Sequence, residues 1–477
     1  MTRIVVVGGG PAGYEAALVA SSLGAEVTLI EANGVGGACV LFDCVPSKTL
    51  IATSDKVTAY RDSPSVGVGS RVDVRVDLVA VNHRIKDLAT AQSEDIRTRL
   101  VRDGVTVLLG RGRFACAQTG RAYRVEVLDG GGSVTDEIAA DVVLVATGAV
   151  PRELAGSPCD GERILSWRQL YDLTELPEHL IVIGSGVTGA EFASGYSELG
   201  VAVTLVSSRD RVLPGEDADA ADVIERVFTE RGGTLVKQAR ARAVTRTGSD
   251  PGDGVQVELA DGRKVSGSHA LICVGSVPNT LDLGLEHVGL GLDGRGYLAV
   301  DRVSRTGGSG IYAAGDCTGV LPLASVAAMQ GRIAMWHALG EAVTPLRLKT
   351  VAANVFTHPE IATVGIGASG VDASGFETGN GSVRPRAVTL PLVGNARAKM
   401  SRQVDGFVRL YCREETGVVI GGVIVAPDAS ELILPVALAV QRRLTVDDLA
   451  STFAVYPSLS GSVTEAARRL MHHTDLD

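Results

Sequence analysis

The sequence predicts an α/β protein that contains two Rossmann-like dinucleotide-binding domains and a C-terminal α+β domain. Three observations support this prediction. A unit of strand, glycine turn, helix and strand occurs twice; the 477 residues include 58 glycines but only 4% aromatic residues; and a series of short apolar runs follows residue 350. Parallel strands that lead directly into nucleotide-binding helices need tight, glycine-containing turns, and this length suits about three domains.

The charge and the cysteines narrow the class of protein further. The formal net charge is −10, which disfavours general binding to nucleic acids because such binding needs a basic surface. The seven cysteines are odd in number and widely scattered, unlike the disulfide framework of a small secreted protein. Since no uninterrupted run of 18 apolar residues occurs, we expect no membrane span and a cytoplasmic location.

The first dinucleotide unit opens the chain. Arg3 to Val7 is a short apolar run typical of a buried parallel strand, and the sequence GGGPAG at residues 8–13 leads into a helical pattern. A second strand, Glu26 to Ile30, is followed by Glu31. The glycines allow a pyrophosphate to approach the N-terminus of the helix, and the acid can accept hydrogen bonds from ribose hydroxyls. The glycines of this motif are Gly8, Gly10 and Gly13.

The second dinucleotide unit repeats this order. A predicted strand, His179 to Ile183, precedes the sequence GSGVTG at residues 184–189, a helical pattern through Leu199 and a strand from Val201 to Val206. The glycines of this motif are Gly184, Gly186 and Gly189. Two such units imply two bound dinucleotides, which suggests a flavin enzyme that is reduced by a nicotinamide nucleotide.

The end of the second unit indicates which nicotinamide nucleotide binds. NAD-selective units place an acid at this position, whereas this chain has Ser207, followed by Arg209 and Arg211. The missing acid and the added arginines favour a 2′-phosphate, and hence NADP(H). The arginines are also compatible with ordinary surface charges, so NAD(H) stays open as an alternative.

Directly after the first unit comes the stretch GGACVLFDCVPSK, residues 36–48. A helix that begins near Cys39 would bring Cys39 and Cys44 onto nearby turns of one face. The spacing permits a disulfide without requiring one, and two buried core cysteines would also fit. No histidine lies nearby in the sequence, so we expect no metal site here.

Apolar periodicity and capping residues predict the remaining elements. Asp77 is the predicted N-cap of a helix that runs to Arg102. Further predicted strands are Val105–Leu109, Tyr123–Leu128, Val142–Ala146, Ala270–Val274 and the run that ends at Asp316, and a helix is predicted over Pro322–Leu339. From Val351 onward, VFTHPEIATVGI, FVRLYC and VVIGGVIVA are predicted as strands, and Glu431–Arg442 and Val446–Ser451 as helices.

These motifs, in this order, resemble the flavoprotein disulfide reductases, the family of lipoamide dehydrogenase, glutathione reductase and mercuric reductase. The resemblance covers essentially the whole chain. It rests on the GGxCxxxxCxPSK stretch, both glycine turns, the ATG and GDC segments, and VFTHPEIATVG. It implies an FAD domain in two parts (1–150 and 277–349), an inserted NAD(P) domain (151–276) and a dimerisation domain (350–477), hence a homodimer or a higher homo-oligomer.

The resemblance also implies roles for single residues. Lys48 would lie near the flavin N5 atom and pair with Glu191. The residues that would hold FAD are Gly8, Gly10, Gly13, Glu31, Thr147, Gly148 and Asp316, with Asp316 at the ribitol. The residues that would hold the nicotinamide nucleotide are Gly184, Gly186, Gly189, Ser207 and Arg209.

The chain departs from the family where protons are transferred. The family uses a histidine oriented by a glutamate, in a segment similar to HPTxSE from the partner subunit, to move the proton of thiol–disulfide exchange. Here Tyr456 and Gly461 stand in those two places. A phenol titrates near about pH 10 and an imidazole near about pH 6.5, so tyrosine is a poor substitute. Asp43 also replaces a glycine before Cys44, and its carboxylate should disfavour a thiolate there.

We therefore expect an NAD(P)H dehydrogenase that passes electrons through FAD to a quinone-type acceptor, with weak or no disulfide reductase activity. The candidate catalytic residues are Cys39, Cys44, Lys48, Glu191 and Tyr456, the last of them lining the acceptor pocket. Three alternatives stay open: a disulfide reductase with an unusual proton donor, a pyridine nucleotide transhydrogenase, and a non-catalytic FAD-binding subunit. Mercuric reductase is disfavoured because the C-terminal tail has no cysteine pair.

Overall fold

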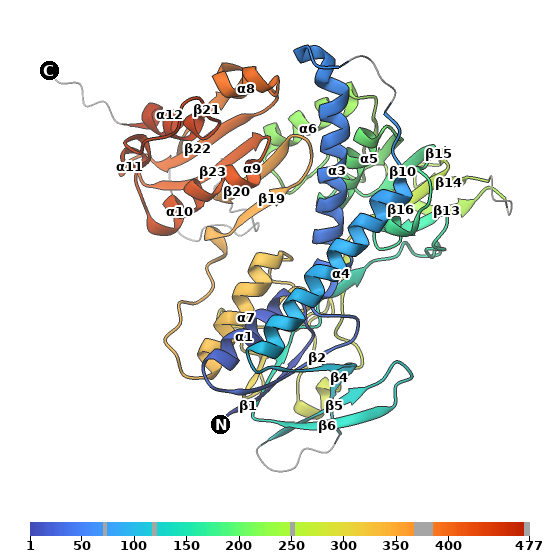
Figure 1. Ribbon diagram of the computed structural model, residues 1–477, viewed down its shortest axis with the longest axis vertical. Helices are drawn as coiled ribbons and strands as arrows, with labels where there is room; N and C mark the ends of the chain where they lie inside the picture. Colours follow the sequence, from blue (N-terminus) through green and yellow to red (C-terminus); the bar gives the residue numbers. More distant parts are fainter. Residues whose placement is uncertain (70–73, 117–121, 249–252, 367–384, 472–477) are drawn as a thin grey trace.

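The computed structural model describes residues 1–69, 74–116, 122–248, 253–366 and 385–471 (Figure 1). Two five-stranded parallel sheets and one five-stranded antiparallel sheet form its three main parts. Figure 1 shows the first parallel sheet in the lower half, the second in green at the upper right, and the C-terminal part in orange and red at the upper left. The predicted fold class is confirmed. Within the described part of the chain, no helix is both long enough and apolar enough to cross a membrane.

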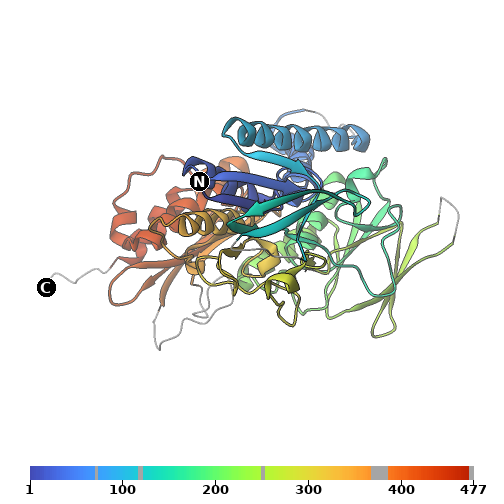
Figure 2. The same cartoon turned by 90° about the horizontal axis from the view of Figure 1, so that it is seen from below.

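The first parallel sheet has the strand order β18-β7-β1-β2-β3. One face of β1, with Ile4 and Val6, packs on helices, whereas the other face, with Val5 and Val7, packs on a small antiparallel sheet. The turned view in Figure 2 shows α4 along an outer side of this part. The sheet consists of β1 (Arg3–Val7), β2 (Glu26–Glu31), β3 (Thr106–Leu109), β7 (Val142–Val145) and β18 (Ile311–Ala313). Around it lie α1 (Pro11–Ser22), α2 (Gly37–Leu41), α4 (Leu78–Arg102), α7 (Ala324–Ala338), β4 (Arg111–Phe114), β5 (Tyr123–Leu128) and β6 (Val134–Ala140). The helix α3 (Cys44–Asp62) leads away from this sheet, and its Leu50 and Val57 pack in the hydrophobic cluster of the second parallel sheet.

The second parallel sheet has the order β12-β11-β10-β16-β9 and repeats this arrangement. Leu180 and Val182 of β10 pack on helices, and Ile181 and Ile183 pack on a three-stranded antiparallel sheet. The sheet consists of β9 (Ile164–Ser166), β10 (His179–Ile183), β11 (Ala202–Val206), β12 (Thr234–Val236) and β16 (His269–Ile272). Its companions are α5 (Val187–Leu199), α6 (Ala218–Glu230), β13 (Ala241–Arg246), β14 (Val255–Leu259) and β15 (Lys264–Gly267).

A two-stranded ribbon joins the two dinucleotide units. β8 (Ala149–Pro151) pairs antiparallel with β17 (Ser276–Pro278), so the chain leaves the first unit and returns to it side by side. The second unit is therefore an insertion between two parts of the first. The boundaries predicted at 150/151 and 276/277 fall within these two strands.

The C-terminal sheet is antiparallel, with the order β19-β20-β23-β22-β21. One of its faces contributes Ile361, Tyr411 and Val423 to the hydrophobic cluster that also contains α3 and α5 residues. The sheet consists of β19 (Ala352–Val355), β20 (Glu360–Gly365), β21 (Pro385–Pro391), β22 (Phe407–Arg413) and β23 (Val419–Ala426). Its helices are α8 (Ala396–Ser401), α9 (Ala429–Leu432), α10 (Leu434–Arg442), α11 (Val446–Ala450) and α12 (Gly461–Leu470).

Two predicted elements of the C-terminal part are each broken in the structure. The run VFTHPEIATVGI, residues 355–366, is not one strand: it holds the last residue of β19, the hairpin tip from Phe356 to Pro359, and β20. The predicted helix Glu431–Arg442 is interrupted before α10, which carries a proline in its first turn; proline lacks the N–H that a continuous helix would need. The predicted cap of α4 is confirmed, since the Asp77 side chain accepts from Ala80 N at 3.0 Å.

Candidate active site

The first glycine turn forms a tight cradle at the end of β1. Gly8 has a φ of +104°, and a Cβ on Gly8 or on Gly13 would overlap a backbone carbonyl oxygen. Glu31 is buried; its Oε2 accepts from Gly9 N at 2.6 Å and its Oε1 from Asn33 N at 2.8 Å. The N-cap residue of α1 is Gly10, so no side chain caps the first N–H groups of this helix. These features fit a dinucleotide whose pyrophosphate faces α1 and whose ribose lies by Glu31.

The second glycine turn has the same backbone and a different acid position. Gly184 has a φ of +107°, and its N–H donates to Val206 O at 2.9 Å, as Gly8 N does to Ile30 O at 2.8 Å. Ser207 thus occupies the place that Glu31 occupies in the first unit. Its hydroxyl is buried and lies 2.7 Å from Ser185 Oγ.

The two turns differ at two neighbouring positions, and residue size explains why both positions change together. In the first unit, a Cβ on Gly9 would lie 3.1–3.2 Å from the side chain of Glu31, so an acid and a larger residue cannot easily stand together. In the second unit, Ser185 takes the place of Gly9 and faces the small Ser207. Arg209 follows, exposed, with its N–H donating to Ser207 Oγ at 3.1 Å.

The two cysteines lie on different helices, which corrects the predicted single helix. Cys39 is in α2, and Cys44 is the first residue of α3. The backbone between them leaves the helical region at Asp43, where φ is −125° and ψ is −96°. Because α3 begins at Cys44, Pro46 falls in its first turn, where the missing N–H costs no intrahelical hydrogen bond. A helix running through from Cys39 would have placed this proline in its interior.

The two thiols are free and interact with each other. The hydrogen bond from Cys44 lowers the pKa of Cys39, although burial and Asp43 oppose this. The same bond raises the pKa of Cys44, and burial and the negative charges of Cys39 and Asp43 add to the effect. The expected influence of Asp43 has the predicted direction but is smaller than that of the neighbouring thiol. Burial also raises the pKa of Asp43 itself.

Lys48 and Glu191 form a largely buried ion pair between α3 and α5. Lys48 Nζ lies 2.8 Å from Glu191 Oε2, and the carboxylate side chain is 3% exposed. Burial alone would lower the pKa of Lys48, but the charge of Glu191 and its hydrogen bond help to outweigh burial and raise it. The ammonium also lies 4.9 Å from the centre of the Phe356 ring. The lysine is therefore held as a cation at a fixed place near the cysteines.

The remaining predicted FAD residues surround the return of the chain to the first sheet. Asp316 follows β18 and is half-buried; burial, and then the charge of Asp43, raise its pKa to about 6. Thr147 Oγ1 donates to Asn279 O at 2.6 Å, and Gly148 has a φ of +68°. These residues place a titratable carboxyl and a tight turn on the same side as the first glycine cradle.

Tyr456 is not brought to the cysteines within one chain. Its side chain is 86% exposed, and the neighbouring Phe453 and Val455 are exposed as well. Sequence reasoning missed Phe356, at the tip of the β19–β20 hairpin, whose N–H bonds Glu191 and whose ring faces Lys48. It also missed His358 in the same tip, which bonds Ser194 on α5 and Asp55 on α3. The apolar pattern of VFTHPEIATVGI predicts a strand, and the proline in its middle is the signal for the turn that the structure shows there.

A protein with two nucleotide cradles, a dithiol and a buried lysine–glutamate pair between them is built for two-electron transfer from a nicotinamide nucleotide through a flavin. The chain belongs to the pyridine nucleotide-disulphide oxidoreductase family: the family model matches residues 2–331, and the model of its dimerisation domain matches residues 351–467. Members of this family are oxidoreductases that bind FAD and NAD(P).

Curated relatives and solved structures agree with this assignment. An NAD(P)H dehydrogenase (quinone) of Mycobacterium tuberculosis is 61% identical over 482 residues, covering 100% of this chain and 95% of the relative. Dihydrolipoyl dehydrogenase 2 of Haloarcula marismortui is 33% identical, covering 98% and 96%. The crystal structure of LpdA from Mycobacterium tuberculosis matches with a TM-score of 0.92 and 60% identity, covering 99% of this chain and 100% of that chain.

Proposed function

We propose that this chain oxidises NADPH or NADH and reduces a quinone to the hydroquinone, with FAD as its bound cofactor. The observation that carries the proposal is the state of the dithiol. Cys39 and Cys44 lie together, but the positions of the family's proton-transferring histidine and glutamate hold Tyr456 and Gly461. Quinone reduction needs no thiol exchange, so it does not depend on the missing dyad. The relative named NAD(P)H dehydrogenase (quinone) supports the same acceptor class.

The residues of the chain divide the work as follows. FAD, when bound, supplies two-electron chemistry between the nicotinamide nucleotide and the acceptor. The first cradle and Asp316 would hold it, and the second cradle would hold NADP(H) or NAD(H). We assign Lys48, fixed by Glu191, to the flavin edge, where its positive charge would favour developing negative charge. We assign Tyr456 to the acceptor pocket as a hydrogen-bond donor to a quinone oxygen.

A disulfide reductase is the second candidate, because the pKa of Cys39 is lowered by its neighbour. A thiolate is the attacking species in disulfide exchange. This reading needs a proton donor other than the family's histidine.

Acceptor assays separate the two candidates. We expect NADPH oxidation with benzo- and naphthoquinones, and little or none with lipoamide or glutathione disulfide. Cys39→Ser should keep most quinone turnover, and Cys116→Ser, which changes an exposed thiol, serves as the control. Rapid disulfide turnover that Cys39→Ser abolishes, together with negligible quinone reduction, would show that the disulfide reading is right.

We further propose a homodimer. The family match to a dimerisation domain supports it, and so does a group of exposed apolar side chains in that part of the chain. They are Leu434, Leu438, Phe453, Val455 and Tyr456. Burial of such a group against a second copy would remove apolar area from water. The domain ranges 1–150, 151–276, 277–349 and 350–477 and the cytoplasmic location stay predictions.

A further inference from the structure

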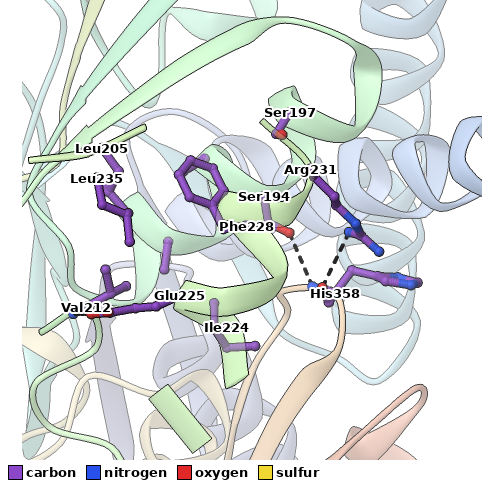
Figure 3. Close-up of a pocket in the computed structure, with 12 residues that line it drawn as sticks. Ser194, Ser197, Leu205, Val212, Ile224, Glu225, Phe228, Arg231, Leu235 and His358 are labelled. Atoms are coloured by element: carbon purple, nitrogen blue, oxygen red, sulfur yellow. Dashed lines mark hydrogen bonds between the residues drawn. The ribbon is translucent and has the colours of Figure 1, made fainter. Parts of the chain in front are cut away.

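The tip of the β19–β20 hairpin lies between helices α3 and α5 and bonds to both. Phe356 N donates to Glu191 Oε1 at 3.0 Å, and His358 N donates to Ser194 Oγ at 3.2 Å. His358 Nδ1 lies 3.2 Å from Asp55 Oδ1 on α3. Figure 3 shows the His358 backbone between Ser194 and Arg231, the latter donating to His358 O at 3.4 Å. The C-terminal part thus contacts both nucleotide-binding units at one point.

The helix spacing ties this tip to the lysine–glutamate pair. On α3, Lys48 and Asp55 are seven residues apart, and on α5, Glu191 and Glu198 are also seven apart. Seven residues are about two helical turns, so each pair of residues shares one face of its helix. One charged cluster therefore lies about 10 Å along the helices from the other, and the hairpin tip spans the two.

His358 sits among charges from three elements. Asp55 of α3 and Glu198 of α5 are negative, and Arg231, just after α6, is positive; Arg231 Nη1 lies 3.1 Å from Glu198 Oε1. The His358 side chain is 21% exposed and that of Glu198 is 2% exposed. Burial lowers the pKa of His358, but the hydrogen bond of Asp55 and the charge of Glu198 raise it more than burial and Arg231 lower it.

The side chains of Asp55, Glu198 and His358 lie close enough together to bind one cation. The contacts of Glu198 show that the cation bound to this cluster is the guanidinium of Arg231. Its Oε1 is bonded by Arg231 and by Ser194 at 3.0 Å, and its Oε2 by Ser54 at 3.0 Å. Both carboxylate oxygens are therefore already used by side chains of the protein, and the cluster is an ion-pair network.

We propose that the hairpin tip is a strap that fixes Glu191, and through it Lys48, and that His358 is the positioning residue that holds the strap in place. This inference rests on the proposed function, since it gives the strap a role in the reaction with the nicotinamide nucleotide. Glu191 has two oxygens: one bonds Lys48 and the other bonds the Phe356 N–H. The Phe356 ring also contacts the lysine ammonium. A displaced tip changes both contacts at once.

The direction of the pH effect follows from the charges around His358. Its pKa in the folded chain is raised above the ordinary value, so the protonated form stabilises the closed strap. That stabilisation is complete below about pH 6.5 and is lost as the pH rises through the raised pKa. Above it, Asp55 and the buried Glu198 lose the charge of the imidazolium, while the ion pair of Glu198 with Arg231 remains.

The test compares the FAD-loaded chain with His358→Asn and with the control His287→Asn. The first variant keeps the backbone bonds to Ser194 and Arg231 and removes only the imidazole. The control removes another histidine that faces a carboxylate, Glu286 at 3.6 Å, away from the strap. Amide hydrogen exchange of the peptide around Phe356 reports the bond to Glu191, and anaerobic reduction of the flavin by NADPH reports the site.

At pH 6, His358→Asn should exchange the Phe356 amide about tenfold faster or more, because one hydrogen bond between charged groups contributes at least about tenfold. Flavin reduction should slow less, about three- to tenfold, because Lys48 keeps its own bond to Glu191. At pH 8.5 both differences from the unmodified chain should shrink to less than about twofold. His287→Asn should match the unmodified chain at both pH values. If His358→Asn does not fold, Asp55→Asn, which changes a side chain that is 44% exposed, takes its place with the same expectation.

Three results would overturn the proposal: unchanged exchange at Phe356, faster exchange with an unchanged reduction rate and pH profile, or equal effects of the control variant. The first shows that His358 does not hold the tip, and the second shows that the tip does not position the pair. If no nicotinamide nucleotide reduces the flavin of the unmodified chain, the proposed function fails, and the exchange comparison still decides whether His358 holds the strap.

Discussion

Gly186→Ala is the sharpest probe of the second nucleotide cradle, because the added methyl group meets only empty space in the protein. Gly186 has a φ of −73° and a ψ of −174°, which alanine adopts freely, and no heavy atom lies within 4 Å of a Cβ built there. The space above it is where the pyrophosphate would approach the N-terminus of α5. The substitution therefore acts on the nucleotide and leaves the fold intact.

The size of the effect can be worked from these contacts. Alanine lowers the entropy of the unfolded chain but is a poorer N-cap than glycine, and the two effects, each under about 1 kcal/mol, nearly cancel. A methyl group in the path of the pyrophosphate removes one charge-assisted hydrogen bond from a backbone N–H, about 1.5–3 kcal/mol. We therefore expect a KM for NADPH about 10- to 100-fold higher, with an unchanged FAD content and a nearly unchanged unfolding temperature.

The matched control is Gly189→Ala, one turn further along α5. Its Cβ would overlap the carbonyl oxygen of Gly184, so the strand and the helix would have to separate, at about 3 kcal/mol of stability. The assays are NADPH-dependent quinone reduction, flavin absorbance and thermal unfolding. An unchanged KM in Gly186→Ala would refute the assignment of this turn to the nicotinamide nucleotide. Loss of FAD instead would show that the two cradles have exchanged roles.

Two further predictions concern nucleotide choice and acidity. The double variant Ser185→Gly/Ser207→Glu rebuilds the acid site of the first unit, so the ratio of kcat/KM for NADH over NADPH should rise about tenfold or more. The single variant Ser207→Glu should fold less stably, because the acid crowds Ser185. An unchanged ratio in the double variant would contradict the role of position 207. Burial raises the pKa of Asp316 to about 6, so the flavin-free chain should become less stable by about 1–2 kcal/mol as the pH rises from about 4 through 6. This figure is reduced from the full linkage value because the side chain is half-buried. In urea unfolding, Asp316→Asn should not show this loss, and parallel pH curves for the two chains would exclude the effect.

The parts of the fold that the sequence could predict are those in which a local pattern decides the structure. Both strand–glycine–helix units appear at the predicted places, because Gly8 and Gly184 adopt a positive φ and a close approach to a neighbouring backbone that other residues would not allow. The failures have a common cause. Pro46, Pro359 and Pro435 each mark a break in an element that apolar periodicity alone had made continuous.

The sequence and the family resemblance could name Lys48 and Glu191 as candidates but could not show how the candidate site is assembled. The family resemblance named Lys48 and Glu191, which are 143 residues apart, and the structure shows their ion pair. No local pattern could show that Phe356 bonds the second oxygen of Glu191, or that His358 reaches Asp55, 303 residues away. Such contacts depend on how the C-terminal sheet packs against α3 and α5, which is a property of the whole fold.

The two glycine turns show how one backbone can serve two nucleotides. Their hydrogen bonds from Gly8 and Gly184 to the second strand are 2.8 Å and 2.9 Å long, and the two turns carry different side chains. Where the first unit combines a glycine with Glu31, the second combines Ser185 with Ser207. Because the bulk allowed at one position depends on the other, the acid cannot be gained or lost by a single substitution without strain or a void. We therefore expect nucleotide choice to depend on this pair of positions, so that a single acid at position 207 is a weaker test than the pair exchanged together.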